Sequence, residues 1–278
     1  MFLKKVYKKK IIITGKTGLL GSTFFNKYKN KYNIVAYPHR IEKINKFTNW
    51  LGKKNFHIFI HFAGITNVKK NNNNEYLNKI NTISSINLLK ALTKKKIPFL
   101  DYFLFISSSH VYGYSNKKIK ETKKTCPISP YGRSKKKVED FIFNFRKNFN
   151  FKVGVARVFN FTGKNQKKGH FIPDIFYKVK SHKQINKINQ FRDFIHIDDV
   201  CKALDLILKN KIEKPINVSS GKKINLIKIA KIANNKISNK PAIFGKKRGG
   251  DIFGDNKFLR SLGLRKFKNI NQIINSYK

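Results

Sequence analysis

The stretch IIITGKTGLLG, residues 11–21, decides the fold of this chain. A short apolar run typical of a buried strand ends in glycines at Gly15, Gly18 and Gly21, and a helical pattern follows. Glycine allows a tight turn and lets main-chain N–H groups approach a diphosphate at the N-terminus of the next helix, where the helix dipole favours anions. Because dinucleotide-binding folds keep such a loop after their first strand, we predict a dinucleotide site here instead of a purely structural turn.

Further apolar runs follow at spacings that leave room for a helix between them, at residues 33–37, 57–64, 99–109 and 151–160. This alternation predicts an α/β fold: a doubly wound, parallel Rossmann-type sheet with helices on both faces. After Asn160 the alternation loosens, and the C-terminal part that begins near residue 215 contains a clear strand at 215–220 and two amphipathic helices. We therefore predict an NAD(P)-binding domain over 1–162, to which 190–212 returns, and a small substrate-binding lid domain over 163–278.

The end of the second apolar run, IVAYPHR, bears on the choice of cofactor. An NAD site usually places Asp or Glu here to bind the ribose 2′-hydroxyl, whereas the 2′-phosphate of NADP requires a cation. This chain has His39 and Arg40 at that point. The pattern favours NADP over NAD, and the alternative is that both are ordinary surface residues.

The composition is strongly basic, with a formal net charge of +47 from 61 Lys and Arg residues against 14 acids. Such an excess is typical of nucleic-acid binding. Here the lysines are scattered along the chain, and Asn, Ile, Phe and Tyr are also abundant, as expected from a genome rich in A and T. We therefore expect no nucleic-acid partner.

Two further features exclude other classes. No apolar segment approaches the roughly 20 residues of a membrane span, and the first residues lack the apolar centre of a signal peptide, so we expect a cytoplasmic protein without a membrane partner. Cys126 and Cys201 are far apart and lack metal-ligand spacing, so we interpret them as reduced thiols and expect no metal.

The stretch ISPYGRSKKKVED, residues 128–140, predicts a helix that begins at Ser129 and Pro130. The apolar stripe of this helix continues to Phe149. Of three consecutive lysines only Lys135 falls in the stripe, one turn from Tyr131. A nearby ammonium lowers the pKa of a tyrosine from about 10 towards neutrality, which would make Tyr131 a general acid and base for hydride transfer.

A run of hydroxyl side chains, Ser107–Ser109, ends the buried strand in FLDYFLFISSSHVYG. These side chains are expected at the edge of the sheet where ligands of open α/β sheets bind, and can hydrogen-bond a substrate oxygen. A serine run after a strand is more often plain loop. The glycine loop, the serines and the Tyr131–Lys135 pair, in this order, make chance a poor explanation.

Nine stretches together resemble the extended short-chain dehydrogenase/reductases, the NAD-dependent epimerase/dehydratase family that acts on nucleotide sugars. They are TGKTGLLG, HFAG, YLNKINTISSINLL, SSSHVYG, PISPYGRSK, ARVFNFTG, RDFIHIDDV, INVSSG and RGGD. The resemblance implies catalysis by Ser108, Tyr131 and Lys135, with Ser107 and Ser109 in support. It implies cofactor contacts from Gly15, Thr17, Gly18, Leu20, Gly21, Ala63, Gly64, Asn81, Tyr131 and Lys135, beside His39 and Arg40. It implies substrate contacts from Ser108, Asn160, Arg192 and Arg248.

Arginine is rare in this chain, with eight residues among the 61 basic ones, and five of them fall at the proposed ligand sites or in catalytic motifs. A planar guanidinium binds phosphate at two points, which lysine cannot copy. Arg157 is the exception, because we interpret it as a structural partner of a carboxylate such as Asp193 or Asp198. His196, inside an apolar run, is likewise interpreted as structural.

Ser109 and His110 stand where the family's dehydratases carry Asp-Glu, which argues against a 4,6-dehydratase. The closest resemblance is to reductases of NDP-linked 4-keto-6-deoxyhexoses, with an NDP-hexose 4-epimerase as the alternative. His110 is either a second acid/base for an epimerising reductase or a loop histidine. A non-catalytic relative that binds NADP or RNA is the alternative of another class. The resemblance also implies a homodimer formed through long helices.

Overall fold

A computed structural model describes residues 8–52, 54–66, 74–95, 97–186, 188–238, 240–246 and 249–277. The chain divides into two compact units that are interleaved in sequence. The first takes in Met1–Ser107, Arg133–Val155 and Ile207–Lys214, and the second Ser108–Gly132, Ala156–Leu206 and Pro215–Lys278. Because these divisions run through helices and strands, the domain boundary expected after residue 162 stays a prediction.

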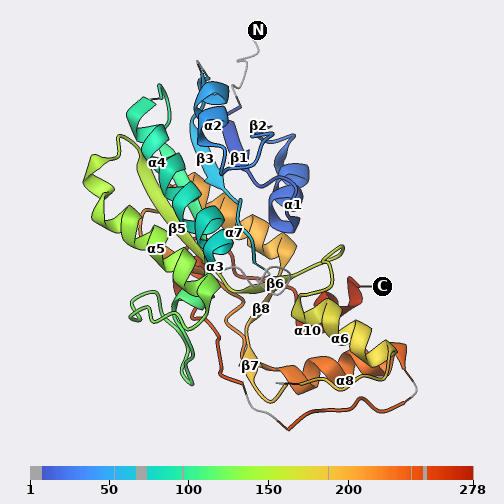
Figure 1. The fold of residues 1–278 in the computed structure, drawn as a ribbon. Coiled ribbons are helices and arrows are strands. Elements are labelled where there is room, and N and C mark those ends of the chain that lie inside the picture. Colours follow the sequence, from blue (N-terminus) through green and yellow to red (C-terminus); the bar gives the residue numbers. More distant parts are fainter. Residues whose placement is uncertain are drawn as a thin grey trace. The chain divides into compact units, whose positions relative to one another are not determined.

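The main sheet has six strands in the order β2-β1-β3-β4-β5-β9, the doubly wound arrangement that the alternating pattern predicts (Figure 1). The strands are β1 (Lys10–Thr14), β2 (Asn33–Ala36), β3 (Ile58–His61), β4 (Tyr102–Ser108), β5 (Lys152–Val158) and β9 (Pro215–Val218). β1 pairs in parallel with both β2 and β3, and β3 pairs in parallel with β4. All six predicted strands are therefore confirmed, within a few residues at their ends.

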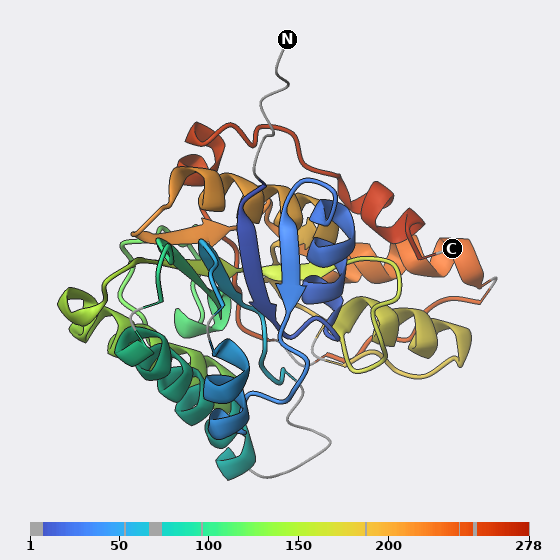
Figure 2. The ribbon, with the colours of Figure 1, turned by 90° about the horizontal axis from the view of Figure 1, so that it is seen from above.

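The helices of the first unit lie on both faces of its strands. They are α1 (Leu19–Tyr28), α2 (Ile44–Leu51), α3 (Asn74–Asn78), α4 (Ser84–Lys95) and α5 (Pro130–Asn144), of which α5 begins in the second unit. Seen from above, α2, α4 and α5 lie on one side of the strands and α1 on the other (Figure 2). Between α3 and α4 the chain makes a π-helical turn over Lys79–Ile83.

The strand residues alternate between these two helical layers, as the period of two requires. Ile12 and Phe59 lie in one core cluster with side chains of α2, α4 and α5, while Phe24 of α1 packs against Phe62 outside that cluster. Both layers are apolar, because each strand of a parallel sheet is covered on both faces. Helices therefore pack on both faces of the sheet and hold the carboxyl ends of its strands in place. Ligands bind at these strand ends in this architecture.

The second unit contains a separate helical layer and two small sheets. α6 (Phe171–Lys180), α8 (Leu226–Ile237) and α10 (Ile270–Asn275) share one apolar core, and α8 lies beside α6 (Figure 1). β6 (Asn160–Thr162) pairs with β8 (Phe194–His196), and β7 (Phe191–Arg192) pairs with β10 (Ile224–Asn225). α7 (Ile197–Asn210) follows β8, and a short α9 (Lys257–Ser261) lies between α8 and α10.

The two amphipathic helices expected near the C-terminus are thus α8 and α10, with α9 as a short addition. Within the described ranges, no helix is both long and apolar enough to pass through a lipid bilayer.

Candidate active site

The glycine loop between β1 and α1 has the geometry of an anion-binding turn. Gly15 has φ +71°, and a Cβ there would lie 2.6 Å from the main-chain nitrogen of Ala63. A Cβ on Gly21 would lie 2.3 Å from the carbonyl oxygen of Gly15, so both positions exclude a side chain. Gly18 is the N-cap of α1 and no side chain caps this helix, which leaves N–H groups of its first turn for a ligand.

The other two predicted contacts of this loop differ in exposure. Thr17 is exposed at the turn, whereas Leu20 is buried and anchors the first turn of α1 in the core. The loop therefore presents main chain and a hydroxyl to solvent while its hydrophobic residue fixes the helix.

Behind the loop, a buried histidine that the sequence analysis did not single out holds three elements together. His61, at the end of β3, shares hydrogen bonds with the Thr14 hydroxyl at 2.8 Å and the Ser85 hydroxyl at 2.9 Å. The Thr14 hydroxyl also accepts from the N–H of Ala63 at 3.2 Å. Burial lowers the pKa of His61 to about 3, with a further contribution from the charge of Lys135, so the ring is neutral. The uncharged ring of His61 therefore connects β3 to β1 and α4 through hydrogen bonds.

Gly64, Asn81 and Lys135 converge at the end of β3. A Cβ on Gly64 would lie 3.2 Å from both the Oδ1 of Asn81 and the Nζ of Lys135. Asn81 is fully buried, and its side-chain oxygen accepts from the N–H of Ile65 at 2.8 Å. Its side-chain nitrogen donates to the carbonyl of Ile65 at 2.9 Å and to the hydroxyl of Ser134 at 3.2 Å. The π-helical turn that carries Asn81 is a feature often found at functional sites.

Lys135 points inward, as predicted from its place in the helical stripe. Its side chain is 4% exposed, its ammonium donates to the carbonyl of Ile106 on β4 at 2.9 Å, and it lies 4.8 Å from the ring centroid of Phe105. Lys136 instead pairs with Asp140, and Lys137 is exposed. The stripe itself is shorter than predicted, because α5 ends at Asn144 before it reaches Phe149.

A buried carboxylate accompanies this lysine. Glu139, one turn further along α5, has no exposed surface and accepts a hydrogen bond from the hydroxyl of Ser107 at 2.5 Å. Burial lowers the pKa of Lys135 to about 8, and the charge of Glu139 opposes this change. The spacing of four residues between Lys135 and Glu139 was the available signal for this pair, and the sequence analysis missed it.

Ser108 and Tyr131, the predicted proton-transfer pair, both lie in the second unit. Ser108 ends β4, and its hydroxyl hydrogen-bonds the Tyr131 phenol and accepts from the N–H of His110 at 3.3 Å. Burial raises the pKa of Tyr131 to about 12, and the hydrogen bond from Ser108 only partly offsets this rise. The predicted lowering of this pKa is therefore wrong for the protein without ligands, since desolvation outweighs any effect of the neighbouring cation.

His110 lies beside this phenol. Its ring packs edge-on against Tyr131 with centroids 5.7 Å apart, in a 3-10 turn over Ser109–Val111. Burial, and then the charge of Arg192, lower the pKa of His110, so the ring is neutral at pH 7. The geometry brings a second titratable ring to the phenol, while a catalytic role for it stays a prediction.

Two of the predicted substrate residues, Asn160 and Arg192, lie on the small sheets of the second unit. Arg192, on β7, donates to the carbonyl of Phe191 at 2.9 Å and to that of Gly250, and it lies over the ring of Tyr114 at 5.9 Å. Asn160 is half-buried and opposes Phe194 across the β6–β8 pair. Arg248 lies outside the described residues.

Two residues interpreted as structural have contacts that agree with that role. Arg157 is buried and donates to the Tyr112 hydroxyl at 2.9 Å and to the carbonyl of Glu121 at 3.2 Å. Its pairing with Asp193 or Asp198 stays a prediction. His196 accepts from the N–H of Asp198 at 3.1 Å.

At the predicted 2′-phosphate position, Arg40 has an exposed side chain that pairs with Glu42 at 2.6 Å and donates to the hydroxyl of Tyr76. His39 is exposed and its ring lies edge-on to Tyr37. The carboxylate of Glu42 was missed, because it lies two residues beyond the expected acidic position.

The residues of the glycine loop and those around Gly64 fit a nicotinamide dinucleotide. The uncapped N-terminus of α1 and the two glycines that exclude side chains suit its diphosphate, and Asn81 and Lys135 line the bare Cα of Gly64 beyond them. Tyr131 lies four residues before Lys135 on α5, which begins in the second unit and continues into the first.

Comparisons with known proteins agree with this geometry. The model of the NAD dependent epimerase/dehydratase family matches residues 11–219. The chain is 29% identical over 285 residues to a putative UDP-glucose 4-epimerase of Methanocaldococcus jannaschii, covering 91% of this chain and 92% of that protein. It is 26% identical over 223 residues to the GDP-6-deoxy-D-talose 4-dehydrogenase of Aggregatibacter actinomycetemcomitans, covering 76% of this chain and 74% of that protein.

Among solved structures, RMD from Pseudomonas aeruginosa complexed with NADPH superposes with a TM-score of 0.85 at 24% identity, over 96% of this chain and 97% of that one. At that identity the match shows the fold alone. The fold and the match to the family model together define a short-chain dehydrogenase/reductase. The chain belongs to the NAD dependent epimerase/dehydratase family, as its sequence motifs predicted.

Proposed function

We propose that this protein is an NAD(P)-dependent reductase of a nucleotide-linked 4-keto-6-deoxyhexose. The observation that carries the proposal is the Tyr131 phenol, which is hydrogen-bonded to Ser108 and whose pKa is raised to about 12, so that it is protonated. Tyr131 lies on α5, the helix that also carries the buried Lys135. A phenol that keeps its proton at neutral pH is a proton donor in its resting state. Reduction of a ketone requires such a donor.

Each residue has a definite task in this reaction. A bound nicotinamide supplies the hydride to the carbonyl carbon. Ser108 hydrogen-bonds the carbonyl oxygen, and Tyr131 donates its phenolic proton to that oxygen as negative charge develops on it, which yields the alcohol. Lys135, one turn away, stabilises the phenolate that remains until a proton from solvent restores the phenol.

The names of the relatives support chemistry at position 4 of the sugar. One is named a 4-epimerase and the other a 4-dehydrogenase. A 4-epimerase is therefore the second candidate, and the name of the archaeal relative is what favours it. An epimerase uses the same proton-transfer pair but keeps its cofactor bound and returns the hydride to the other face of the sugar.

The test is turnover of purified protein with a GDP-linked 4-keto-6-deoxyhexose, followed by the loss of NADPH absorbance. A reductase consumes one NADPH for each sugar, whereas a 4-epimerase interconverts UDP-glucose and UDP-galactose without net consumption. Tyr131→Phe should abolish turnover and leave NADPH binding intact. Binding of nucleotide or RNA without turnover of any such substrate would refute the proposal and favour a non-catalytic relative.

We extend the proposal to NADP as the preferred cofactor. Its support is Arg40, whose guanidinium is exposed at the end of the second strand. Glu42 now pairs with this guanidinium, so a 2′-phosphate would compete with that carboxylate. Arg40→Asp should raise the KM for NADPH relative to that for NADH by tenfold or more, and an unchanged ratio would contradict the preference.

Three further assignments belong to the same proposal. Asn160, Arg192 and Arg248 are proposed to contact the substrate, and alanine at each should raise the KM for the nucleotide sugar more than it lowers kcat. His110 is proposed as a second acid/base only if the product shows inversion next to the carbonyl carbon.

We also propose that the protein is a homodimer. Phe143 is 36% exposed on α5, and Phe145, which follows that helix, is 47% exposed, as residues of a helix-mediated interface would be in an isolated chain. Light scattering after size-exclusion chromatography decides this, and a monomer at micromolar concentration would refute it.

A further inference from the structure

A basic cavity opens on the second unit, lined by residues that the proposed reaction does not use. Its volume is about 550 Å³, within the size range of small-ligand sites. Six of its ten lining residues are basic, and its one acidic residue is Asp199. The basic residues are Lys202, Lys222, Arg260, Arg265, Lys266 and Lys268.

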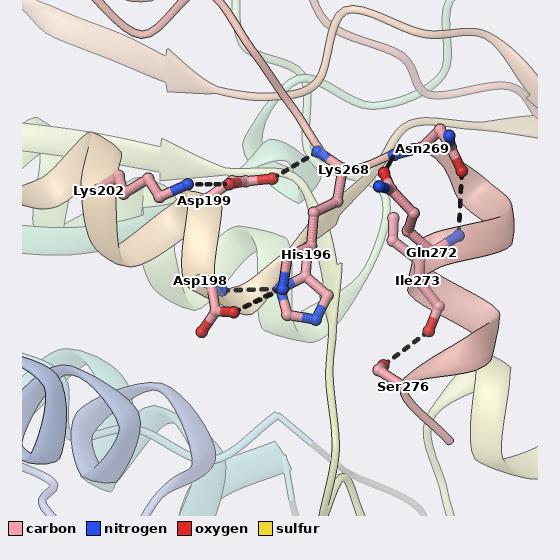
Figure 3. A network of polar contacts seen from close by, with 9 residues as sticks. All are labelled: His196, Asp198, Asp199, Lys202, Lys268, Asn269, Gln272, Ile273 and Ser276. Atoms are coloured by element: carbon pink, nitrogen blue, oxygen red, sulfur yellow. Dashed lines mark hydrogen bonds and ion pairs between the residues drawn. The ribbon is translucent and has the colours of Figure 1, made fainter. Parts of the chain in front are cut away.

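Two of these cations are already paired (Figure 3). Lys268 places its ammonium 2.7 Å from the carboxylate of Asp198, and its main-chain N–H donates to Asp199 at 2.8 Å. The ammonium of Lys202 donates a hydrogen bond to the other carboxylate oxygen of Asp199 at 3.1 Å. Asp199 is 1% exposed, and its two oxygens already accept hydrogen bonds from Lys202 and from the main chain of Lys268.

The other four basic residues of the cavity have no acidic partner among the described residues. Over the described part of the chain, no carboxylate pairs with Lys222, Arg260, Arg265 or Lys266, and all four side chains are exposed. Like charges around one hollow repel each other, and a bound polyvalent anion removes that repulsion.

The two arginines are the informative members of this set. The chain has only eight arginines, yet Arg260 and Arg265 both line this cavity. Arg260 donates to the carbonyl of Arg265 at 3.2 Å, and Gly263 between them has φ +107°, so the loop folds back and brings these two lining residues close together. A guanidinium binds phosphate through two parallel hydrogen bonds, which a lysine in the same place cannot make.

We propose that this cavity binds a small anion with more than one phosphate group, such as a condensed phosphate or the phosphates of a nucleotide, through Arg260 and Arg265. Lys222 and Lys266 add charge, and the paired Lys202 and Lys268 shape the wall. The site is independent of the Ser108–Tyr131 pair, because none of its lining residues belongs to the proposed catalytic set.

The test is calorimetric titration of the full chain with inorganic tripolyphosphate at low ionic strength. The variant Arg260→Gln/Arg265→Gln should lose one binding event, with its affinity at least tenfold weaker. A second cavity of about 420 Å³ on α8 provides the control, because its two lysines, Lys228 and Lys231, can be exchanged with the same change of net charge. Lys228→Gln/Lys231→Gln should leave the binding event within twofold of wild type.

A charge-preserving variant separates the shape of the guanidinium from its charge. Arg260→Lys/Arg265→Lys should also weaken tripolyphosphate binding several-fold, since lysine keeps the charge and loses the two-point hydrogen bonds. Equal losses in the arginine and the control variants would mean non-specific attraction to a basic surface and would overturn the proposal, as would unchanged binding in both arginine variants. Repeating the titration with ATP then distinguishes a nucleotide from a free condensed phosphate. NADPH turnover of the arginine variants is a separate readout, so failure of this site would leave the proposed reaction untouched.

Discussion

The buried ammonium of Lys135 should leave a measurable trace in the pH dependence of stability. Its pKa falls from the ordinary value of 10.5 to about 8 in the folded protein. Between these values the unfolded chain binds more protons than the folded one, so wild-type stability should rise with pH. The cost of burying the charge is fully present below the folded pKa and is relieved as pH rises through about 8 to 10.5. With these two values, the unfolding free energy of the wild type should rise by roughly 2–3 kcal/mol from pH 7 to pH 10.

The assay is urea unfolding of wild type and Lys135→Met at several pH values in this range. The difference in unfolding free energy, wild type minus variant, should increase by roughly 2–3 kcal/mol between pH 7 and pH 10. The lost hydrogen bond to Ile106 shifts both ends of the comparison equally, so it does not affect the slope. Lys137→Met is the matched control, because that lysine is exposed on the same helix and its difference should stay flat. A flat difference for Lys135→Met as well would refute the account of a buried, partly compensated charge.

Three other outcomes follow from the same contacts. Gly21→Ala should raise the KM for the dinucleotide far more than Gly18→Ala. The added Cβ lies 2.3 Å from a main-chain oxygen in the first variant and 3.4 Å from it in the second, and similar KM values for the two variants would contradict the loop geometry. Glu42→Gln should lower the KM for NADPH and leave that for NADH unchanged by freeing Arg40, and no change for NADPH would argue against a 2′-phosphate contact. Glu139→Gln should move the alkaline fall of the pH–rate profile to lower pH, because loss of the carboxylate lowers the pKa of the neighbouring ammonium; an unmoved profile would show that the carboxylate does not support it.

Much of the fold was predictable because the signals are local. The apolar runs identify all six strands of the main sheet, and the hydroxyl of Ser129 accepts from the N–H of Gly132 at 3.0 Å at the predicted start of α5. The inward direction of Lys135 followed from helical periodicity alone.

The errors concern quantities that depend on burial in three dimensions. The pKa of Tyr131 was predicted in the wrong direction, since its spacing from a cation is visible in sequence but its desolvation is not. Glu139 and His61 were missed because their partners, Ser107 and Thr14, are 32 and 47 residues away along the chain. The contacts of Arg157 likewise depend on where Tyr112 and Glu121 are placed by the fold.

The π-helical turn before α4 has an evolutionary consequence. Such a turn contains one residue more than the α-helical turn that would replace it, so deletion of a single codon could restore an uninterrupted helix. The buried leucines of α4 would keep their packing, while the side chain in the place of Asn81 would change. The presence or loss of that one codon would therefore show, in any descendant of this gene, whether the proposed cofactor contact of Asn81 had been retained.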